Sequence, residues 1–495
     1  MTETQDYSDN DATIEIDPST ALEKVLAEVS EWKLEAKNED NGRYFFHVKE
    51  VASIENGKRA YVIGRKGSGK TAISEYLGQI SDHETFSKKL TFKNFPFNAL
   101  YALKNDEFGS PNQYITLWTY VIYSTICQMM MKNNNINAAA REKIERVFGD
   151  SNLTLDRRIG KWTAKEFHIG ALSVNLKIGG QIDKSDDLPW IDRVDILGDF
   201  ILENIDDARY FVIFDELDED YRDVTELKKF KSYTALITGL FKAVQGVKAK
   251  FKEINARIMP IVFLRDDIYS LMDDSDKTKW GDFKIDLTWD EQKARELVAF
   301  RLTRAFDANS KEPLPFEKAW RMLIGTSTMR YGTKKKNSMD SFSYIARSTY
   351  LRPRDFVKFL QECAVRALAS GDGRISSEII HSVDTAFSSY LKEELRDEIF
   401  AIIPEINSVF DAMTQVGKWN FSYSEFQHAY KETVDSDVNT SKLNFCLQVL
   451  FLFSVVGTAL NHNTYVFKYT HKDGQMNYKN RIIVHRGLFK ALQIV

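Results

Sequence analysis

The chain contains few of the residues that organise disulfide-rich or zinc-binding domains. Cysteine occurs only at positions 127, 363 and 446 of 495 residues, without any CxxC pair. This spacing argues against a disulfide framework or a zinc ribbon, so we expect three buried thiols in a reducing compartment. Proline, with 9 residues, and glycine, with 24, are also scarce. Their scarcity favours a helix-rich architecture.

The chain also lacks a basic start, a long apolar run and a strong charge of either sign. Residues 1–20 contain six acidic and no basic side chains, and they have no apolar segment of the kind found in signal peptides. The longest apolar run, Phe445–Leu460, is interrupted by Gln448 and is too short to span a bilayer. The net charge of -4 gives no strong basic field for nucleic acid. We therefore expect a cytoplasmic protein with no membrane contact and a disordered acidic tail over residues 1–18.

From about residue 40, short apolar runs alternate with helical patterns, as is typical of a parallel α/β sheet. Several of these runs are continuous, as expected of central strands that are buried on both faces. An insertion over about 100–195 adds helical material at 113–148 and a possible hairpin at 165–182. The expected strands cover residues 59–63, 90–94, 210–214, 258–264 and 283–287.

After residue 288 the apolar residues follow a helical period, which predicts a helical lid domain over 289–394. The third unit, 395–495, contains helical patterns at 395–416, 422–433 and 440–454 and then two strands around a polar turn. This order predicts a C-terminal winged-helix domain. The core preceding the lid is expected to span residues 19–288.

The segment YVIGRKGSGKTAI contains a complete G-x-x-x-x-G-K-[ST] motif between an apolar strand and a helix. Its glycines allow the backbone to approach phosphate oxygens, and successive N–H groups with the helix start provide a positive concavity. Lys70 is expected to reach the β- and γ-phosphates, and the Thr71 hydroxyl is expected to bind Mg²⁺. We expect the side chains of Arg65 and Lys66 to face solvent. The predicted nucleotide-binding residues are Gly64, Arg65, Lys66, Gly67, Ser68, Gly69, Lys70, Thr71 and Ala72.

A second pattern, YFVIFDELDED, ends a buried strand with Asp215 and Glu216. An aspartate in this place can hold Mg²⁺ as a Walker-B residue does. The adjacent Glu216 is suited to orient or deprotonate an attacking water. Asp218 is either a supporting carboxylate or a solvated side chain.

Three arginines are candidates for contact with the terminal phosphate. Arg265 ends the apolar strand IMPIVFL, at the edge where open α/β sheets bind ligands. Arg352 and Arg354 flank Pro353 at a predicted helix start in the lid. The alternative for each arginine is a salt bridge within the protein, for example between Arg265 and Asp266 or Asp267.

The segments GRKGSGKT, FDELD, FLRDDIY and RPRDF, in this order and followed by a winged-helix pattern, resemble bacterial P-loop ATPases of the AAA+/STAND class, origin-recognition-like or KAP-like. The Arg265 strand is similar to the STAND arginine strand, and Arg352–Arg354 is similar to the second sensor of origin-recognition-type ATPases. The resemblance implies ATP and Mg²⁺ as ligands, homo-oligomers and a role in anti-phage defence. STAND proteins usually carry sensor repeats and an effector domain, which this sequence does not show, so a separate effector protein is expected.

Three functions remain open from the sequence. The first is an ATP-hydrolysing oligomeric switch that acts on an effector, with Lys70, Asp215, Glu216 and Arg265 as its catalytic residues. The second is an ATPase that binds or loads duplex DNA through its winged helix. The third is a non-hydrolysing, nucleotide-gated interaction protein. An arginine from another subunit could complete the site, with Arg157 and Arg158 as candidates.

Overall fold

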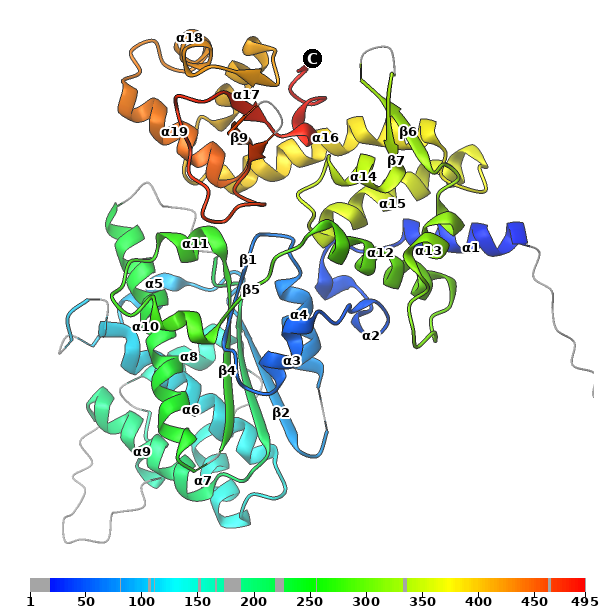
Figure 1. The fold of residues 1–495 in the computed structure, drawn as a ribbon. Helices are drawn as coiled ribbons and strands as arrows, with labels where there is room; N and C mark the ends of the chain where they lie inside the picture. The colour runs from blue at the N-terminus through cyan, green and yellow to red at the C-terminus, as the bar shows by residue number, and fades with distance from the viewer. Residues whose placement is uncertain are drawn as a thin grey trace, which may run out of the picture.

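The computed structural model describes residues 18–494 except 81, 106–107, 111, 150–152, 165–166, 173–187, 219–226, 255, 333–335 and 462–463. Its centre is a five-stranded sheet in the order β2-β3-β4-β1-β5 (Figure 1). All neighbouring strands in this sheet are parallel, which confirms the predicted fold class. The strands are β1 (Tyr61–Gly64), β2 (Thr85–Thr91), β3 (Arg209–Asp215), β4 (Arg257–Arg265) and β5 (Lys284–Asp286).

The prediction for the second strand was wrong in its bounds, because β2 begins at Thr85 and not at residue 90. β2 lies at the edge of the sheet, and Ser87, Lys88 and Lys89 in its middle are only partly buried. An edge strand does not need a continuous apolar sequence. A search for apolar runs therefore found only its last residues.

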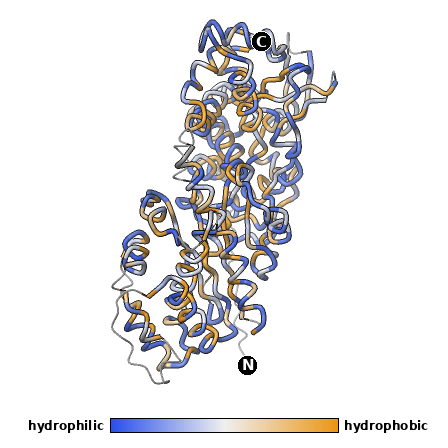
Figure 2. Tube along the Cα trace, turned by 90° about the vertical axis from the view of Figure 1, so that its left-hand side faces the viewer, coloured by the Kyte–Doolittle hydropathy of each residue, from blue (hydrophilic) through white to orange (hydrophobic). Residues whose placement is uncertain are grey.

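Helices cover both faces of the sheet (Figure 1). In β3, Tyr210 and Val212 pack in the apolar cluster that contains α6, α9 and α10, while Phe211 and Ile213 pack with α3 and α4. In Figure 2 hydrophobic and hydrophilic segments alternate along the chain, as expected of helices and strands with one buried face. The helices are α1 (Pro18–Ser30), α2 (Asn41–Tyr44), α3 (Lys49–Glu55), α4 (Lys70–Gln79), α5 (Phe97–Tyr101), α6 (Ile115–Lys132), α7 (Ala138–Phe148), α8 (Leu155–Thr163), α9 (Trp190–Asn204), α10 (Leu227–Lys252) and α11 (Asp266–Leu271).

The insertion between β2 and β3 is helical where it is described. The helices predicted over 113–148 are confirmed as α6 and α7. The hairpin predicted over 165–182 lies mostly outside the described residues, and the described turn Gly170–Leu172 is a 3₁₀ helix. Although α6 is apolar, none of the helices in the described part of the chain is long and apolar enough to cross a membrane.

The region after β5 is a helical layer beside the sheet (Figure 1). Its helices begin at recognisable signals: Asp290 accepts a hydrogen bond from the Lys293 amide, and Pro353 occupies the first turn of α15. The helical period predicted from the apolar residues after residue 288 is confirmed by α12 and α15. The elements are α12 (Glu291–Phe306), α13 (Phe316–Leu323), β6 (Thr328–Tyr331), β7 (Asn337–Asp340), α14 (Ser341–Ala346), α15 (Pro353–Ser370) and α16 (Ser377–Ile399).

The C-terminal region has a winged-helix arrangement of three helices and a four-stranded sheet in the order β10-β9-β11-β8, with β8 between the first two helices in the chain. The two strands expected around the polar turn do not pair with each other, because β9 lies between them. β9 is the end of the long apolar run, which leaves α19 and continues as a buried strand. The elements are α17 (Ile406–Val416), β8 (Asn420–Phe421), α18 (Tyr423–Thr433), α19 (Thr440–Leu452), β9 (Val456–Ala459), β10 (Tyr465–Val466), β11 (Ile482–Val484) and the 3₁₀ turn η7 (Arg486–Leu488).

One apolar core runs through the lid and the C-terminal region without interruption. Leu391 of α16 and Leu488 of η7 belong to the same cluster, and α16 continues past residue 395. At the junction, Gly487 lies so close to the lid that an added Cβ would clash with the Ser348 carbonyl oxygen. The division into units at 288 and 394 remains a proposal.

We predict that Gly487→Ala lowers the free energy of unfolding by about 1–3 kcal/mol, as overpacking typically does. The new methyl group would meet the backbone of Ser348 and, at 2.7 Å, the side chain of Leu391. Urea unfolding of the two proteins measures the difference. Gly281→Ala is the matched control, because an added Cβ there has no neighbour within 4 Å. Equal midpoints for wild type and Gly487→Ala would contradict this account of the junction.

Candidate nucleotide site

The loop between β1 and α4 has the backbone geometry of a phosphate cradle. Gly67 and Gly69 have φ angles of 78° and 99°, in the left-handed region that favours glycine. A Cβ on Gly64 would lie 2.6 Å from Ser68 Oγ, so the chain also needs glycine where the loop begins. Within the described part of the chain, the amides of Lys66, Gly67 and Gly69 have no hydrogen-bond partner. The loop therefore has donors available for an anion at the start of α4.

The carbonyl groups of the same loop are bound by donors from outside the sheet. Arg352 Nη1 donates to the Lys66 oxygen at 3.0 Å, and Trp289 Nε1 donates to the Ser68 oxygen at 2.8 Å. The Arg354 amide donates to the Gly67 oxygen at 3.4 Å. We call these three contacts the carbonyl clamp. Because the clamp binds the carbonyl side of each peptide unit, it stabilises the orientation of the loop.

Lys70 lies at the first position of α4 and is held by the loop itself. Its Nζ donates to the carbonyl oxygens of Gly64 at 2.8 Å and of Arg65 at 3.0 Å. Burial lowers the pKa of Lys70, and the carboxylates of Asp218 and Asp266 oppose that shift. A cation that has only carbonyl partners can gain energy by turning to a phosphate group.

Asp215 is the last residue of β3 and Glu216 follows it, beside the cradle. Asp215 is 3% exposed, accepts a hydrogen bond from Ser74 Oγ at 2.5 Å and pairs with Lys89 Nζ at 2.9 Å. Glu216 has a φ angle of 60°, which is unusual for a residue other than glycine. Its carboxylate is bound by Lys37, 179 residues earlier in the chain.

The predicted arginines occupy different places. Arg265 pairs with Asp267 at 2.7 Å and Asp218 at 3.5 Å. Burial alone would lower the pKa of Arg265, but these carboxylates raise it well above the ordinary value. Arg354 pairs with Glu394 at 3.4 Å.

Arg352 is buried and pairs with Asp355 at 2.8 Å, while its Nη1 completes the carbonyl clamp. It therefore contacts the outer side of the loop. Arg354, by contrast, lines the inner cavity.

One cavity of about 330 Å³ brings most of the predicted site residues together. Those that line it are Lys66, Gly67, Gly69, Lys70, Thr71, Ala72, Asp215, Glu216, Asp218, Arg265 and Arg354. Leu34, Ala36, Tyr44 and Val357 give part of the cavity an apolar wall. The sequence reasoning missed this wall and also Trp289, because no local motif marks them. Gly64, Arg65, Ser68 and Arg352 lie around the cavity but do not line it.

The prediction that Arg65 and Lys66 face solvent was wrong. The Arg65 guanidinium lies 4.5 Å from the ring centroid of Tyr350 and 5.8 Å from that of Tyr469. Its Nη2 donates to the Phe453 carbonyl at 3.1 Å, and Lys66 pairs with Glu394 at 3.5 Å. Aromatic side chains from two segments that are distant in the sequence can bind a cation, although the residues next to that cation in the sequence suggest that it faces solvent.

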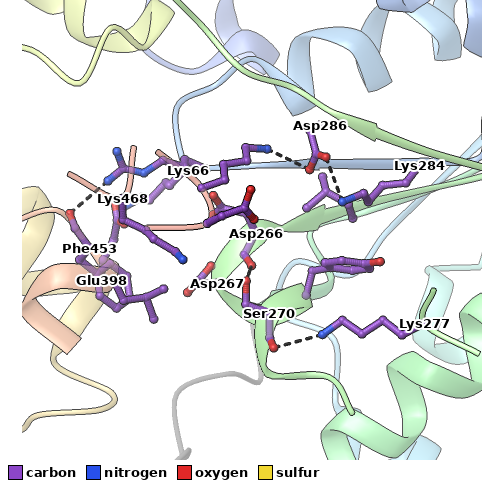
Figure 3. A pocket seen from close by; sticks show the side chains of 16 residues that line it. Lys66, Asp266, Asp267, Ser270, Lys277, Lys284, Asp286, Glu398, Phe453 and Lys468 are labelled. Carbon is purple, nitrogen blue, oxygen red and sulfur yellow. Dashed lines mark hydrogen bonds and ion pairs between the residues drawn. The ribbon is translucent and has the colours of Figure 1, made fainter. Parts of the chain in front are cut away.

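A second cavity, of about 440 Å³, separates the outer side of the loop from the C-terminal region (Figure 3). Phe453 and Lys468 lie on one side of it, and Asp266 and Ser270 of α11 lie on the other. Lys472 crosses the interface to pair with Asp286 at 2.9 Å. The C-terminal region is therefore attached both to the loop and to the end of β5.

His485 is buried in the same interface, with its ring centroid 4.3 Å from that of Tyr350. Its Nδ1 accepts a hydrogen bond from the Gly487 amide at 3.2 Å, with the tautomer assigned from this contact. Burial, together with the positive charges of Arg65 and Arg352, lowers the pKa of His485 to about 3. The ring is therefore neutral at neutral pH.

The donor set fits a nucleotide with a divalent cation. The cradle amides and Lys70 suit phosphate oxygens, and the Thr71 hydroxyl and Asp215 carboxylate are oxygen ligands of the kind that Mg²⁺ takes. Among the described residues, no group of three or more His, Cys, Asp or Glu side chains could hold a metal ion by itself. This agrees with Mg²⁺ sites that use one or two protein ligands and the phosphates of the substrate.

The chain resembles a known protein family over part of its length and a known protein at low sequence identity. The family model described as a FunZ-associated C-terminal helical domain matches residues 292–396, which is the segment from α12 to α16. A protein of Escherichia coli (strain K12), described as a putative transposon gamma-delta 80.3 kDa protein, is 21% identical over 452 residues. That alignment covers 85% of this chain but 60% of the relative, so the chain spans about 60% of the length of the relative.

Two solved structures align over nearly the whole chain with low similarity. The Aeropyrum pernix ORC1 protein in complex with DNA matches with 11% identity and a TM-score of 0.34, over 90% of this chain and 89% of its own. Drosophila ORC bound to DNA matches with 10% identity and a TM-score of 0.29, over 100% of this chain and 96% of its own. These scores are too low to support a functional argument, which must come from the site.

We predict that Arg65→Ala destabilises the protein by about 1–3 kcal/mol, from the loss of the cation–π contacts and of a charged hydrogen bond. Thermal or urea unfolding measures the loss. Arg146→Ala is the matched control, since that side chain is 69% exposed and pairs only with Glu142 on its own helix. An effect of Arg65→Ala no larger than that of the control would contradict the interface described above.

We also predict that His485 makes the protein sensitive to acid. The folded state has a lower pKa for this ring than the unfolded state, so the unfolded state binds more protons between about pH 3 and pH 6.5. Stability from this group is present above pH 6.5 and decreases by up to about 1.4 kcal/mol per pH unit below it. Unfolding of wild type and His485→Gln from pH 7.5 to pH 5 should show a smaller pH dependence in the variant. Parallel curves would contradict the prediction.

Proposed function

We propose that the protein is an ATP-binding and ATP-hydrolysing switch of the AAA+/STAND type. The observation that supports this proposal is the single cavity lined by Lys70, Thr71, Asp215 and Glu216. These are the residue types that phosphoryl transfer to water needs: a cation for the phosphates, ligands for Mg²⁺ and a carboxylate for the water. The apolar wall of the cavity suits the base of the nucleotide. It consists of Leu34, Ala36, Tyr44 and Val357.

Each group has a separate role in this proposal. The cradle amides bind the phosphates, and Lys70 leaves the carbonyls of Gly64 and Arg65 to neutralise the β- and γ-oxygens. Thr71 and Asp215 would hold Mg²⁺, which would supply positive charge to offset the negative charge of the phosphates. Glu216 orients the water and accepts its proton. Arg265 and Arg354 lie on the same cavity and are the candidates to contact the γ-phosphate.

The carbonyl clamp supports a switching role. Arg352 and Arg354 belong to the start of α15, and Arg65 is bound by Tyr350, Phe453 and Tyr469. Because the loop conformation depends on these contacts, phosphate binding and the position of the lid and C-terminal region are energetically linked. By this linkage a partner that displaces the C-terminal region would change nucleotide affinity, and the nucleotide would change partner affinity by the same factor.

The proposed switch acts together with other protein chains. We propose that the chain forms a homo-oligomer and acts with a separate effector protein. The resemblance to AAA+/STAND ATPases supports a role in anti-phage defence. For a contribution from a second subunit, Arg157 on α8 is exposed, whereas Arg158 is 8% exposed and lies against Trp162. Arg157 is therefore the better candidate for an arginine that reaches a neighbouring site.

The cations of the winged helix favour this proposal over DNA binding. Lys442, on the helix that would read DNA, pairs with Asp435 at 3.0 Å and Glu405 at 3.7 Å. Arg481 binds Glu425 at 3.2 Å. Phe445, on the same helix as Lys442, is exposed. Charges already paired with carboxylates contribute less to phosphate binding, and an exposed aromatic side chain does not read base edges in the usual way.

ATP turnover tests the proposal. We expect Glu216→Gln to reduce kcat by about 10²–10⁴-fold with little change in ATP affinity, as removal of a general base does. Lys70→Ala should instead weaken ATP binding, measured by equilibrium titration. Turnover that is equal in wild type and Glu216→Gln would refute hydrolysis at this site. Tight ATP binding without turnover in either protein would favour the non-hydrolysing interaction protein.

A further inference from the structure

Glu216, the proposed base, is bound by a lysine that no motif marks. Lys37 Nζ lies 2.7 Å from both Oε1 and Oε2 of Glu216. The side chains are 28% and 19% exposed, so the pair is partly shielded from water. Both carboxylate oxygens accept from one ammonium group, which is a geometry that fixes the direction of the carboxylate.

The segment that carries Lys37 is fixed on the protein. Lys37 lies on the 3₁₀ turn η1 (Ala36–Asn38), where Asn41 Nδ2 donates to the Ala36 carbonyl at 2.7 Å. The next residue after this turn, Glu39, pairs with the buried Arg301 of α12. The Arg301 guanidinium in turn lies 4.5 Å from the ring centroids of Trp32 and Tyr44. Lys37 is therefore presented by an anchored turn and not by a loose tail.

The backbone of Glu216 adds a second constraint. A left-handed conformation costs a non-glycine residue roughly 1–2 kcal/mol, and such strain concentrates at functional sites. The neighbouring Asp215 has its own cation, Lys89, at 2.9 Å, and a hydrogen bond from Ser74. Lys37 is thus not required to neutralise Asp215, and its contact is specific to Glu216.

We propose that Lys37 is a positioning residue that restrains Glu216 in the resting site. This inference rests on the proposed hydrolytic function. While Lys37 binds both carboxylate oxygens, Glu216 is directed at the ammonium group and not at a water in line with the terminal phosphate. Hydrolysis requires the pair to open, after which the carboxylate accepts a proton from the attacking water. The water oxygen then bonds to the γ-phosphorus, and the bond from that phosphorus to the bridging oxygen breaks, so that ADP leaves with the bridging oxygen.

The contacts of the segment around Lys37 indicate which motion would separate Lys37 from Glu216. The turn η1 lies between α4 of the core and the lid, and its chain is tied to the lid on both sides. Gln361 of α15 donates to the Trp32 carbonyl at 2.9 Å before the turn, and Arg301 of α12 binds Glu39 after it. Glu216 belongs to the core. A displacement of the lid relative to the sheet therefore draws Lys37 away from Glu216, so that lid position controls the base.

Steady-state ATPase kinetics of the full chain test this restraint. We expect Lys37→Ala and Lys37→Met to raise kcat about tenfold, which corresponds to about 1.4 kcal/mol of restraint, with KM changed less than about threefold. Lys37→Arg retains the ion pair and should stay near wild type. The double variant Lys37→Ala/Glu216→Gln should fall to the level of Glu216→Gln, because the gain depends on the released carboxylate.

Lys24→Ala is the matched control, since Lys24 is an exposed lysine of α1 in the same N-terminal region and does not line the cavity. It should leave kcat unchanged. Thermal unfolding identifies a variant that does not fold, in which case Lys37→Met, which keeps the aliphatic stem, decides. A kcat that falls or stays unchanged in a folded Lys37 variant, while wild type hydrolyses ATP through Glu216, overturns the restraint alone. Absence of Glu216-dependent turnover in all variants overturns the proposed function itself.

Discussion

The structure depends on how a short glycine-rich loop satisfies its backbone polar groups. To present amides to an anion, the loop must direct its carbonyl groups the other way, where they need donors of their own. Arg352, Trp289 and the Arg354 amide are these donors, and none of them belongs to the central sheet. The loop sequence supplies the flexibility for the cradle, while the lid supplies its stability.

This dependence explains why the charges around the site are so extensively paired. Arg65, Lys66, Arg352 and Arg354 all lie near the same loop, where unpaired cations would repel one another. Aromatic faces, a carbonyl oxygen and the carboxylates of Asp355 and Glu394 hold them in fixed positions. A polyphosphate entering the cavity brings negative charge into this arrangement, so its binding energy can be transmitted through contacts that already exist.

The sequence predicted what is encoded within a few consecutive residues. The cradle and the Asp215–Glu216 pair follow buried strands directly, and a parallel sheet brings such strand ends to one edge. The sequence did not predict Lys37 or Trp289, which reach the site across 179 and 221 residues. Arg65 was misjudged for the same reason: its environment is made by Tyr350, Phe453 and Tyr469, whose proximity is a property of the fold. The edge strand β2 was placed too late, because three consecutive polar residues, Ser87, Lys88 and Lys89, interrupt its apolar pattern.

The close packing at Gly487 has a consequence for how the molecule can move. An unbroken apolar core joins the lid to the winged helix, and at Gly487 there is no room even for a methyl group between them. A hinge between these two regions would have to expose that core. Across the other boundary, between the sheet and this joined unit, Arg352 of the lid binds the Lys66 carbonyl and Lys472 of the C-terminal region pairs with Asp286. If large-scale motion occurs, we expect it between the sheet and this joined unit, at the boundary where the cavity of the proposed nucleotide site lies.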